Sequence, residues 1–142
     1  MFTGRCDDSN CSTTTPVNRI AKWNGSSWEP VGDGFGAGAV RALAVDSNGT
    51  LYAGGNFITT TVGITVNRVA KWDGASWSGL GSGVNGTVRA LAVGSDGSVY
   101  IGGEFTSRCD DAACGAFTTV NRIAKWTGTS WVTLGSGFNN SV

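Results

Sequence analysis

The chain has 142 residues with 23 Gly, two Pro and no His, and its ten basic and ten acidic residues cancel to a formal net charge of zero. A composition this rich in Gly favours many short strands joined by tight turns over helices. Since no block of like charge stands out, we expect no nucleic-acid partner. The apolar runs fall short of the ~18 residues of a membrane span, so we expect no membrane insertion.

The absence of histidine removes whole classes of chemistry. Ser-His-Asp and Cys-His catalysis are excluded, as are zinc and copper sites built on imidazole ligands. Tyr52 and Tyr100 are the two tyrosines of the chain, and they do not support a copper-radical oxidase. We therefore predict a protein that is not an enzyme, with no catalytic residue, no metal site and no cofactor.

One motif organises the whole sequence. Val-Asn-Arg-(Ile/Val)-Ala-Lys-Trp occurs three times, starting at Val17, Val66 and Val120, and a second Trp follows each first Trp after five residues. The same order of segments recurs around each copy with a period of about fifty residues, which is the length of a kelch-type propeller blade. The chain is therefore predicted to be a repeat protein.

The first 38 residues are predicted to hold only part of a repeat unit. Residues 1–8 align without gaps on residues 104–111, so the chain is expected to begin near the end of a second strand. Residues 17–31 then supply a third and a fourth strand, which make an outer half-unit. Such a half-unit is expected to leave an unpaired strand edge and an uncovered apolar face.

Residues 39–87 are predicted to form a complete unit. Residues 40–45 resemble a buried inner strand, residues 46–49 a hairpin turn, and residues 50–57 a second strand. Residues 66–72 alternate with the two-residue period of a strand, and residues 77–80 complete a fourth strand after another turn. Four antiparallel strands per unit make one propeller blade.

Residues 88–137 repeat this pattern, with strands expected at residues 88–93, 98–105, 120–126 and 131–134. Residues 138–142 align on residues 84–88 and are expected to begin a further unit. The predicted fold is all-β, with four-stranded antiparallel blades of a β-propeller type repeat, two of them complete and one an outer half-blade. This is too few to close a ring, since propellers need roughly four to eight blades.

The four cysteines form two C-x4-C pairs, Cys6 with Cys11 and Cys109 with Cys114, each in a polar loop that contains Asp. Such pairs are typical of local disulfides in a secreted chain, so we predict two disulfides and an extracellular or cell-surface location. A four-thiolate metal site is the alternative, but neighbouring Asp residues oppose thiolate formation. The N-terminus has no signal-peptide pattern, so secretion is expected only if the chain is a segment of a longer precursor.

Each motif also carries a tryptophan pair around a four-residue turn, namely Trp23 and Trp28, Trp72 and Trp77, and Trp126 and Trp131. Paired rings can stack on sugars, which predicts a glycan-binding module. They can instead seal one blade against the next, with each indole N–H satisfied by one partner. Recurrence in the same register favours packing. Arg19, Arg68 and Arg122, which follow Asn in each motif, are likewise expected to make structural ion pairs or carbonyl contacts.

Three motifs carry a resemblance to a known family. They are Gly-Gly-(Asn/Glu)-Phe at the end of the second strand, Asn-Arg-(Ile/Val)-Ala-Lys-Trp in the third, and Trp-Asn-Gly-Ser-Ser-Trp or Trp-Asp-Gly-Ala-Ser-Trp at the last hairpin. With them, the whole chain resembles bacterial extracellular kelch-like and delta-60-type β-propeller repeats. The resemblance implies a four-stranded blade and a mostly extracellular, often multi-repeat parent. It implies no particular activity, since the family hosts many unrelated functions.

The incomplete units suggest a function. We predict a structural subunit that assembles with other copies of itself, or with flanking repeats of a longer chain, into a ring or a filament. The residues expected at the joining ends are Met1, Phe2, Phe138 and Val142. A glycan- or protein-binding module is the first alternative, and a fragment of a larger propeller enzyme is the second.

Overall fold

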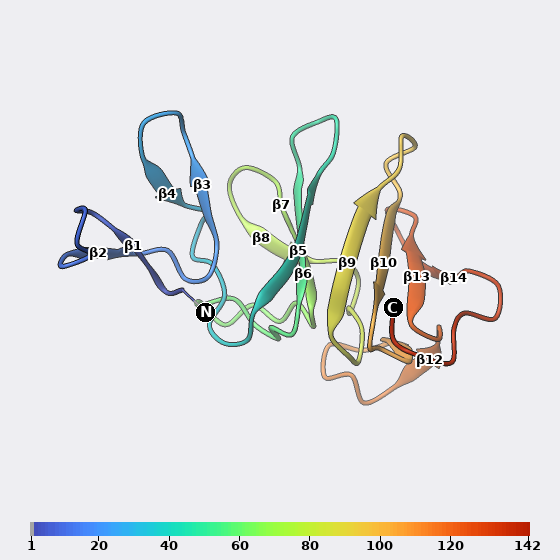
Figure 1. Cartoon of the computed structure of the whole chain (residues 1–142). Helices are drawn as coiled ribbons and strands as arrows, with labels where there is room; N and C mark the ends of the chain where they lie inside the picture. Colours follow the sequence, from blue (N-terminus) through green and yellow to red (C-terminus); the bar gives the residue numbers. More distant parts are fainter. Residues whose placement is uncertain (1) are drawn as a thin grey trace.

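The protein is described by a computed structural model that covers residues 2–142, and all of its regular secondary structure in that range is β-strand (Figure 1). The expected all-β class is therefore confirmed. Across the same residues, no helix exists that is long and apolar enough to pass through a lipid bilayer.

Two four-stranded antiparallel sheets occupy the middle and the C-terminal part of the chain. The first contains β5 (Val40–Val45), β6 (Leu51–Gly55), β7 (Val69–Trp72) and β8 (Trp77–Gly79) in that order. The second contains β9 (Val88–Val93), β10 (Val99–Gly103), β13 (Ile123–Trp126) and β14 (Trp131–Thr133) in the same order. We refer to residues 2–38, 39–87 and 88–137 as the first, second and third units.

The first unit lacks an equivalent of β5 and β6 within the described residues. It consists of β3 (Ala21–Trp23) paired with β4 (Trp28–Pro30), and of a separate hairpin, β1 (Gly4–Cys6) with β2 (Thr14–Pro16). The third unit has the same extra hairpin, β11 (Ser107–Cys109) with β12 (Phe117–Thr119). The sequence pattern predicts polar loops at both places, and the structure instead has a short cysteine-bearing hairpin at each.

The third strand of each unit is shorter than predicted. It begins at Val69 and at Ile123 rather than three residues earlier. The reason is the Asn-Arg pair before it, because Asn67 and Arg68 adopt φ angles of 39° and 73°, outside the range of a strand. The equivalent Asn and Arg residues of the other two units have similar positive φ angles. The backbone therefore turns sharply before each third strand.

Close backbone approach explains the Gly-Gly pair that closes each second strand. A Cβ atom on Gly55 would lie 1.9 Å from the carbonyl oxygen of Ala39, and one on Gly103 would lie 2.1 Å from that of Thr87. The register of the sheet shifts at the same places. A side chain at these positions would push apart the two inner strands, which is why only Gly fits.

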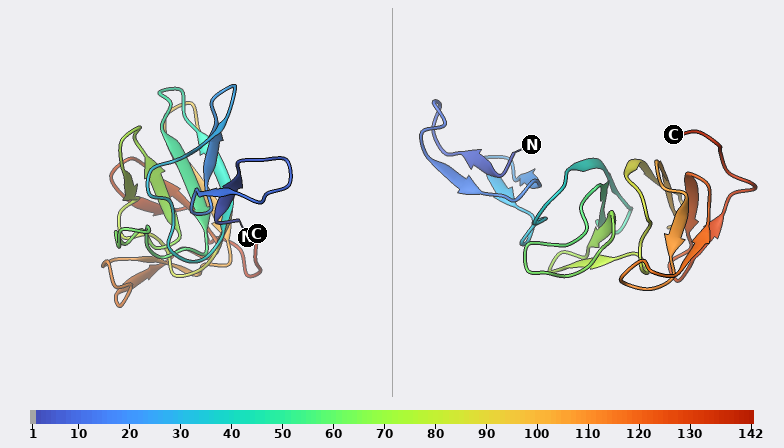
Figure 2. Two further views of the ribbon diagram at one scale, coloured as in Figure 1. Left: turned by 90° about the vertical axis from the view of Figure 1, so that its left-hand side faces the viewer. Right: turned by 90° about the horizontal axis from the view of Figure 1, so that it is seen from below.

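The units follow one another along a curved row (Figure 2), and β9 lies beside β5 and β6. Two apolar clusters form the core, and each joins consecutive units. One cluster combines Ile20, Val31 and Phe35 of the first unit with Ala53, Phe57, Val66, Ala70 and Trp77 of the second. The other combines Tyr52, Val69, Leu80 and Val84 of the second unit with Val88, Val99, Ile101, Phe105, Val120, Ala124 and Trp131 of the third. The core therefore sits mainly at the junctions between units.

Candidate functional site

Three five-residue stretches, which we call junction segments, leave the fourth strand of each unit. They are residues 31–35, 80–84 and 134–138, with the pattern (Val/Leu)-Gly-(Asp/Ser)-Gly-(Phe/Val). Both Gly residues of each segment have positive φ, for example 58° and 65° in the first and 60° and 73° in the third. Such backbone angles are open to Gly and costly for other residues, so the pattern dictates one shared loop shape.

The Asn of the repeated motif holds each junction segment in this shape. The side-chain amide of Asn67 donates to the Ser82 carbonyl at 2.8 Å, and that of Asn121 donates to the Ser136 carbonyl at 2.7 Å. The backbone N–H of the last segment residue in turn donates to the carbonyl of the same Asn, at 3.1 Å for Val84. The third segment therefore has the conformation of the two internal ones.

The second tryptophan of each complete unit anchors the junction segment of the preceding unit. Trp77 is 2% exposed, and its indole Nε1–H donates to the Val31 carbonyl at 2.8 Å. Trp131 is 5% exposed and donates in the same way to the Leu80 carbonyl, also at 2.8 Å. These two rings seal one unit against the next, and each indole N–H is satisfied by one carbonyl.

The first tryptophan of each complete unit packs on the first Gly of the same segment. A Cβ atom on Gly32 would lie 2.3 Å from the Trp72 ring, and one on Gly81 would lie 3.0 Å from the Trp126 ring. The absence of a side chain at these Gly residues therefore makes room for an indole ring. Each junction thus uses both tryptophans of the following unit.

The last residue of the segment fills the centre of the junction. Phe35 stacks on Phe57 with ring centroids 3.9 Å apart, and both rings are fully buried. At the second junction, Val84 and Phe105 are fully buried in one cluster. Val84 also pairs with Arg108 in a β-bridge, so the segment adds its backbone to the edge of the next unit's hairpin.

At the two ends of the row, the residues equivalent to these junction residues are not covered by a neighbouring unit. Phe2 and Phe138, the equivalents of Phe57 and Phe35, are each 54% exposed. Trp23 and Trp28, the equivalents of Trp72 and Trp77, are 54% and 49% exposed. Gly135, which corresponds to Gly32 and Gly81, has no described atom within 4 Å of the position of a Cβ.

A groove of about 450 Å³ lies on the first unit between its cysteine hairpin and its β3–β4 sheet. It is lined by Phe2, Arg5, Cys6, Val17, Ala21 and Trp28. Their equivalents in the third unit, Phe105, Arg108, Cys109, Val120, Ala124 and Trp131, surround the junction segment of the second unit. The groove therefore has the lining of a junction and lacks, among the described residues, a segment to fill it.

An apolar strand at the inner edge is also exposed. Leu43 and Val45 of β5 are 51% and 62% exposed, although the sequence predicted a buried strand here. Their equivalents on β9, Leu91 and Val93, pack against an apolar cluster. The difference arises because β9 has β5 and β6 beside it, whereas the described first unit has no inner strands.

The arginines of the repeated motif contact backbone carbonyls, as expected. Arg19 donates to the Phe35 carbonyl at 2.5 Å, and Arg68 donates to the Val84 carbonyl at 3.0 Å. Arg122 instead donates to the Glu104 carbonyl, at 3.2 Å. The first two arginines therefore tie a strand to the end of a junction segment that is buried by the next unit.

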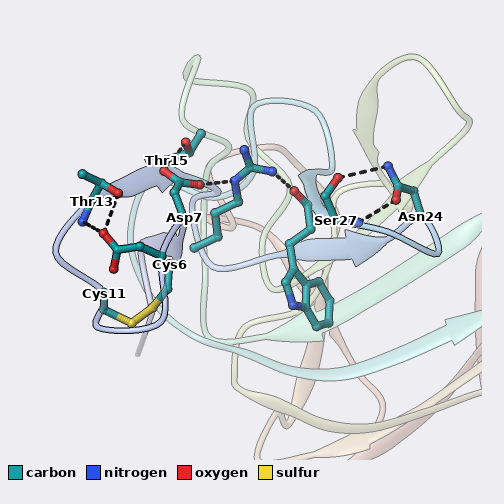
Figure 3. A network of polar contacts seen from close by, with 10 residues as sticks. Cys6, Asp7, Cys11, Thr13, Thr15, Asn24 and Ser27 are labelled. Atoms are coloured by element: carbon teal, nitrogen blue, oxygen red, sulfur yellow. Dashed lines mark hydrogen bonds and ion pairs between the residues drawn. A yellow bond between two sulfur atoms is a disulfide. The ribbon is translucent and has the colours of Figure 1, made fainter.

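Both predicted disulfides are present, Cys6–Cys11 and Cys109–Cys114, and each closes the tip of an extra hairpin. Figure 3 shows the first hairpin, where Asp7 accepts hydrogen bonds at 2.8 Å from both Arg5 and Thr15. Arg5 also donates to the Trp28 carbonyl, which connects the hairpin to the β3–β4 sheet. Arg108 makes the same connection to the Trp131 carbonyl in the third unit.

The remaining carboxylates of the cysteine loops serve as caps for those loops. Hydrogen bonds from Ser12 and Thr13 hold the pKa of Asp8 well below its usual range. The backbone N–H groups of Gly115 and Ala116 lower the pKa of Asp111 in the equivalent position. Among residues 2–142, no group of three or more Asp, Glu, Cys or His side chains is arranged to hold a metal ion.

The predicted end residues fall in different surroundings. Met1 lies outside the described residues. Phe2 borders the open groove, and Phe138 borders a second hollow beside Asn121. Val142 packs over Gly102, whose Cβ would lie 3.2 Å from it, much as Val88 packs over Gly54. The junction segments and their Asn supports were missed, although the Gly-x-Gly repetition after each second Trp was visible in the sequence.

No protein-family model, curated protein or solved structure matches this chain. The resemblance to kelch-like and delta-60-type repeats therefore remains a prediction from short motifs. The junction residues that are buried inside the row have exposed equivalents at its two ends.

Proposed function

We propose that the chain is a non-enzymatic extracellular structural subunit whose units are β-propeller-type blades. It assembles end to end, with its incomplete units completed by neighbouring copies or by flanking repeats of a longer polypeptide, into a ring or a filament. The observation that carries this proposal is the contrast between equivalent residues. Phe35 and Phe57 are fully buried against each other, whereas Phe138 and Phe2 are each more than half exposed.

Exposed aromatic surface of this kind is costly to leave in water. A buried aromatic side chain removes roughly 150–250 Å² of surface, and clustered exposed rings mark interaction sites. In a repeat array each unit obtains its stability from its neighbours. The ends of the row are therefore the surfaces where a further unit would add stability. The two disulfides support the extracellular part of the proposal, since such bonds persist in oxidising compartments.

Sedimentation velocity of the purified chain over a wide concentration range tests the assembly. We expect the weight-average mass to rise with concentration above that of a monomer, and electron micrographs of the same samples to show rings or rods. A constant monomer mass at every concentration would remove self-assembly. Adding salt is a useful control, because apolar junctions strengthen or hold under salt while ion pairs weaken.

The exposed tryptophan pair supports a second candidate, glycan binding. The Trp23 and Trp28 rings lie 5.6 Å apart in an edge-on arrangement and are about half exposed. Two exposed indoles on one hairpin can stack on sugar faces. A glycan array read out by binding, with tryptophan fluorescence as a second signal, separates this candidate from assembly. Binding by monomers that is lost in Trp23→Ala would favour it, and silence across the array would remove it.

A further inference from the structure

We propose that the junction segment at residues 134–138 of one copy occupies the groove of the first unit of a second copy. This inference rests on the proposed assembly function and names the two surfaces that meet. In both internal junctions, the equivalent groove is filled by a segment with the same sequence pattern.

The segment is already shaped for the groove. Asn121 holds it through its side-chain amide and its carbonyl, at 2.7 Å to Ser136 and 2.9 Å from Phe138. Its Gly residues have the same positive φ angles as those of the buried segments. Little conformational entropy is therefore lost on docking, which is the main advantage of a preorganised contact.

The internal junctions specify which side chains meet across the two copies. The Trp28 indole N–H of one copy donates to the Leu134 carbonyl of the other, as Trp131 donates to Leu80. The Trp23 ring covers Gly135, where the described structure leaves open space. The Phe138 ring stacks on the Phe2 ring, as Phe35 stacks on Phe57. One docking event therefore completes all three of these contacts.

The backbone contributes to the same contact. At the second internal junction, Cys109 N–H donates to the Gly83 carbonyl at 2.9 Å and Asn85 N–H donates to the Ser107 carbonyl at 3.0 Å. By the same register, the Cys6 N–H of one copy donates to the Gly137 carbonyl of the other. This short strand addition aligns the segment along the edge of the hairpin and fixes its direction. The disulfide-closed hairpin therefore acts as the docking edge.

The contact is heterologous, because the groove of one copy meets the segment of another. A bound pair of copies still presents one free groove at one end and one free segment at the other, so growth continues until a ring closes or a filament forms. A symmetric contact between two grooves or two segments would instead stop at a dimer. This difference in symmetry makes the proposal testable by mixing two blocked variants.

The experiment uses the full chain with Phe2→Asp, which blocks the groove, and with Phe138→Asp, which blocks the segment. Both side chains are exposed, so neither change disturbs the fold, and circular dichroism with thermal unfolding checks this. We expect each variant alone to lose roughly thirtyfold or more in self-association, as for a central interface residue. An equimolar mixture is expected to form a one-to-one dimer that grows no further, because it restores a single intact junction.

Phe117→Asp is the matched control, since Phe117 is 60% exposed on β12, outside both surfaces. It should assemble like the unmodified chain. If the unmodified chain assembles but either blocked variant still does so alone, or if the mixture stays monomeric, this inference is overturned while assembly itself stands. If the unmodified chain is monomeric throughout, the proposed function fails first.

Discussion

The internal junctions and the two ends of the row are built from the same set of residues and differ in one respect. At the junctions, Trp77 and Phe35 are buried by a neighbouring unit, while at the ends their equivalents Trp28 and Phe138 face solvent. The comparison shows that a unit of this protein does not enclose its own core. Its apolar side chains are completed by the unit beside it, as expected for a repeat protein with nearest-neighbour stabilisation.

The largest expected difference between the two regions concerns the anchoring tryptophan. Trp77→Ala removes a buried ring and its hydrogen bond to Val31, and should cost about 3–5 kcal/mol of unfolding free energy. Trp28→Ala changes an exposed ring and should cost less than about 1 kcal/mol in the monomer. Denaturant unfolding at low protein concentration measures both. Equal costs for Trp77→Ala and Trp28→Ala would mean that these residues do not represent a filled and an empty version of the same junction.

The two disulfides provide the next comparison. They close loops of equal length, so removing either by double Cys→Ser substitution should cost about 2 kcal/mol through loop entropy. Cys109 is also buried whereas Cys6 is exposed, so loss of the Cys109–Cys114 bond should cost more. Thermal unfolding of the two double variants checks the order. A larger loss from the Cys6–Cys11 pair would argue that the first hairpin is already engaged by a partner.

A smaller effect is expected when only the indole N–H donor is removed and an aromatic ring is kept. Trp131→Phe keeps an aromatic ring but removes the donor to the buried Leu80 carbonyl, and should cost about 1 kcal/mol. Trp28→Phe is the matched variant and should leave monomer unfolding unchanged while weakening assembly. If Trp28→Phe leaves self-association unaltered, the Trp28 indole N–H of the unmodified chain makes no contact with another copy.

The smallest expected effect concerns the stability of the two cysteine hairpins at low pH. Asp8 and Asp111 have lowered pKa values in the folded hairpins because hydroxyl and backbone N–H groups donate to them. Their contribution to stability is therefore present above the ordinary Asp pKa of 3.8 and is lost as the pH falls below it. Hydrogen exchange should show both hairpins loosening only in that acid range. Asp8→Asn should weaken the acid response of the first hairpin alone, and a response confined to higher pH would contradict this assignment.

Much of the fold could be predicted from the sequence, because its signals are local and repeated. Alternating residues and turn signals located the strands of both four-stranded sheets, and β5 and β9 have the predicted bounds. The start of the third strand was placed too early, since Asn67 and Arg68 alternate like strand residues while adopting left-handed backbone angles. Periodicity alone does not report such a turn.

The candidate site was only partly predictable. The packing role of the tryptophans followed from their recurrence, but the acceptors of Trp77 and Trp131 lie 46 and 51 residues away in the chain. Contacts this distant leave no local pattern. The hairpins β1–β2 and β11–β12 were missed because a polar loop closed by a disulfide has little apolar alternation. Only the fold reveals that each hairpin forms one wall of a junction groove.

The most direct test of the account is hydrogen exchange of the six indole N–H groups, measured by nitrogen-15 NMR as the protein concentration is raised. The Trp77 and Trp131 indoles should exchange slowly at every concentration, because each donates to a buried carbonyl. The Trp28 indole N–H should exchange fast in the dilute monomer. As copies associate, its exchange rate should fall to that of the Trp77 and Trp131 indoles. Association that leaves Trp28 exchange fast, or slow exchange of Trp28 in the dilute monomer, would contradict the equivalence on which the account depends.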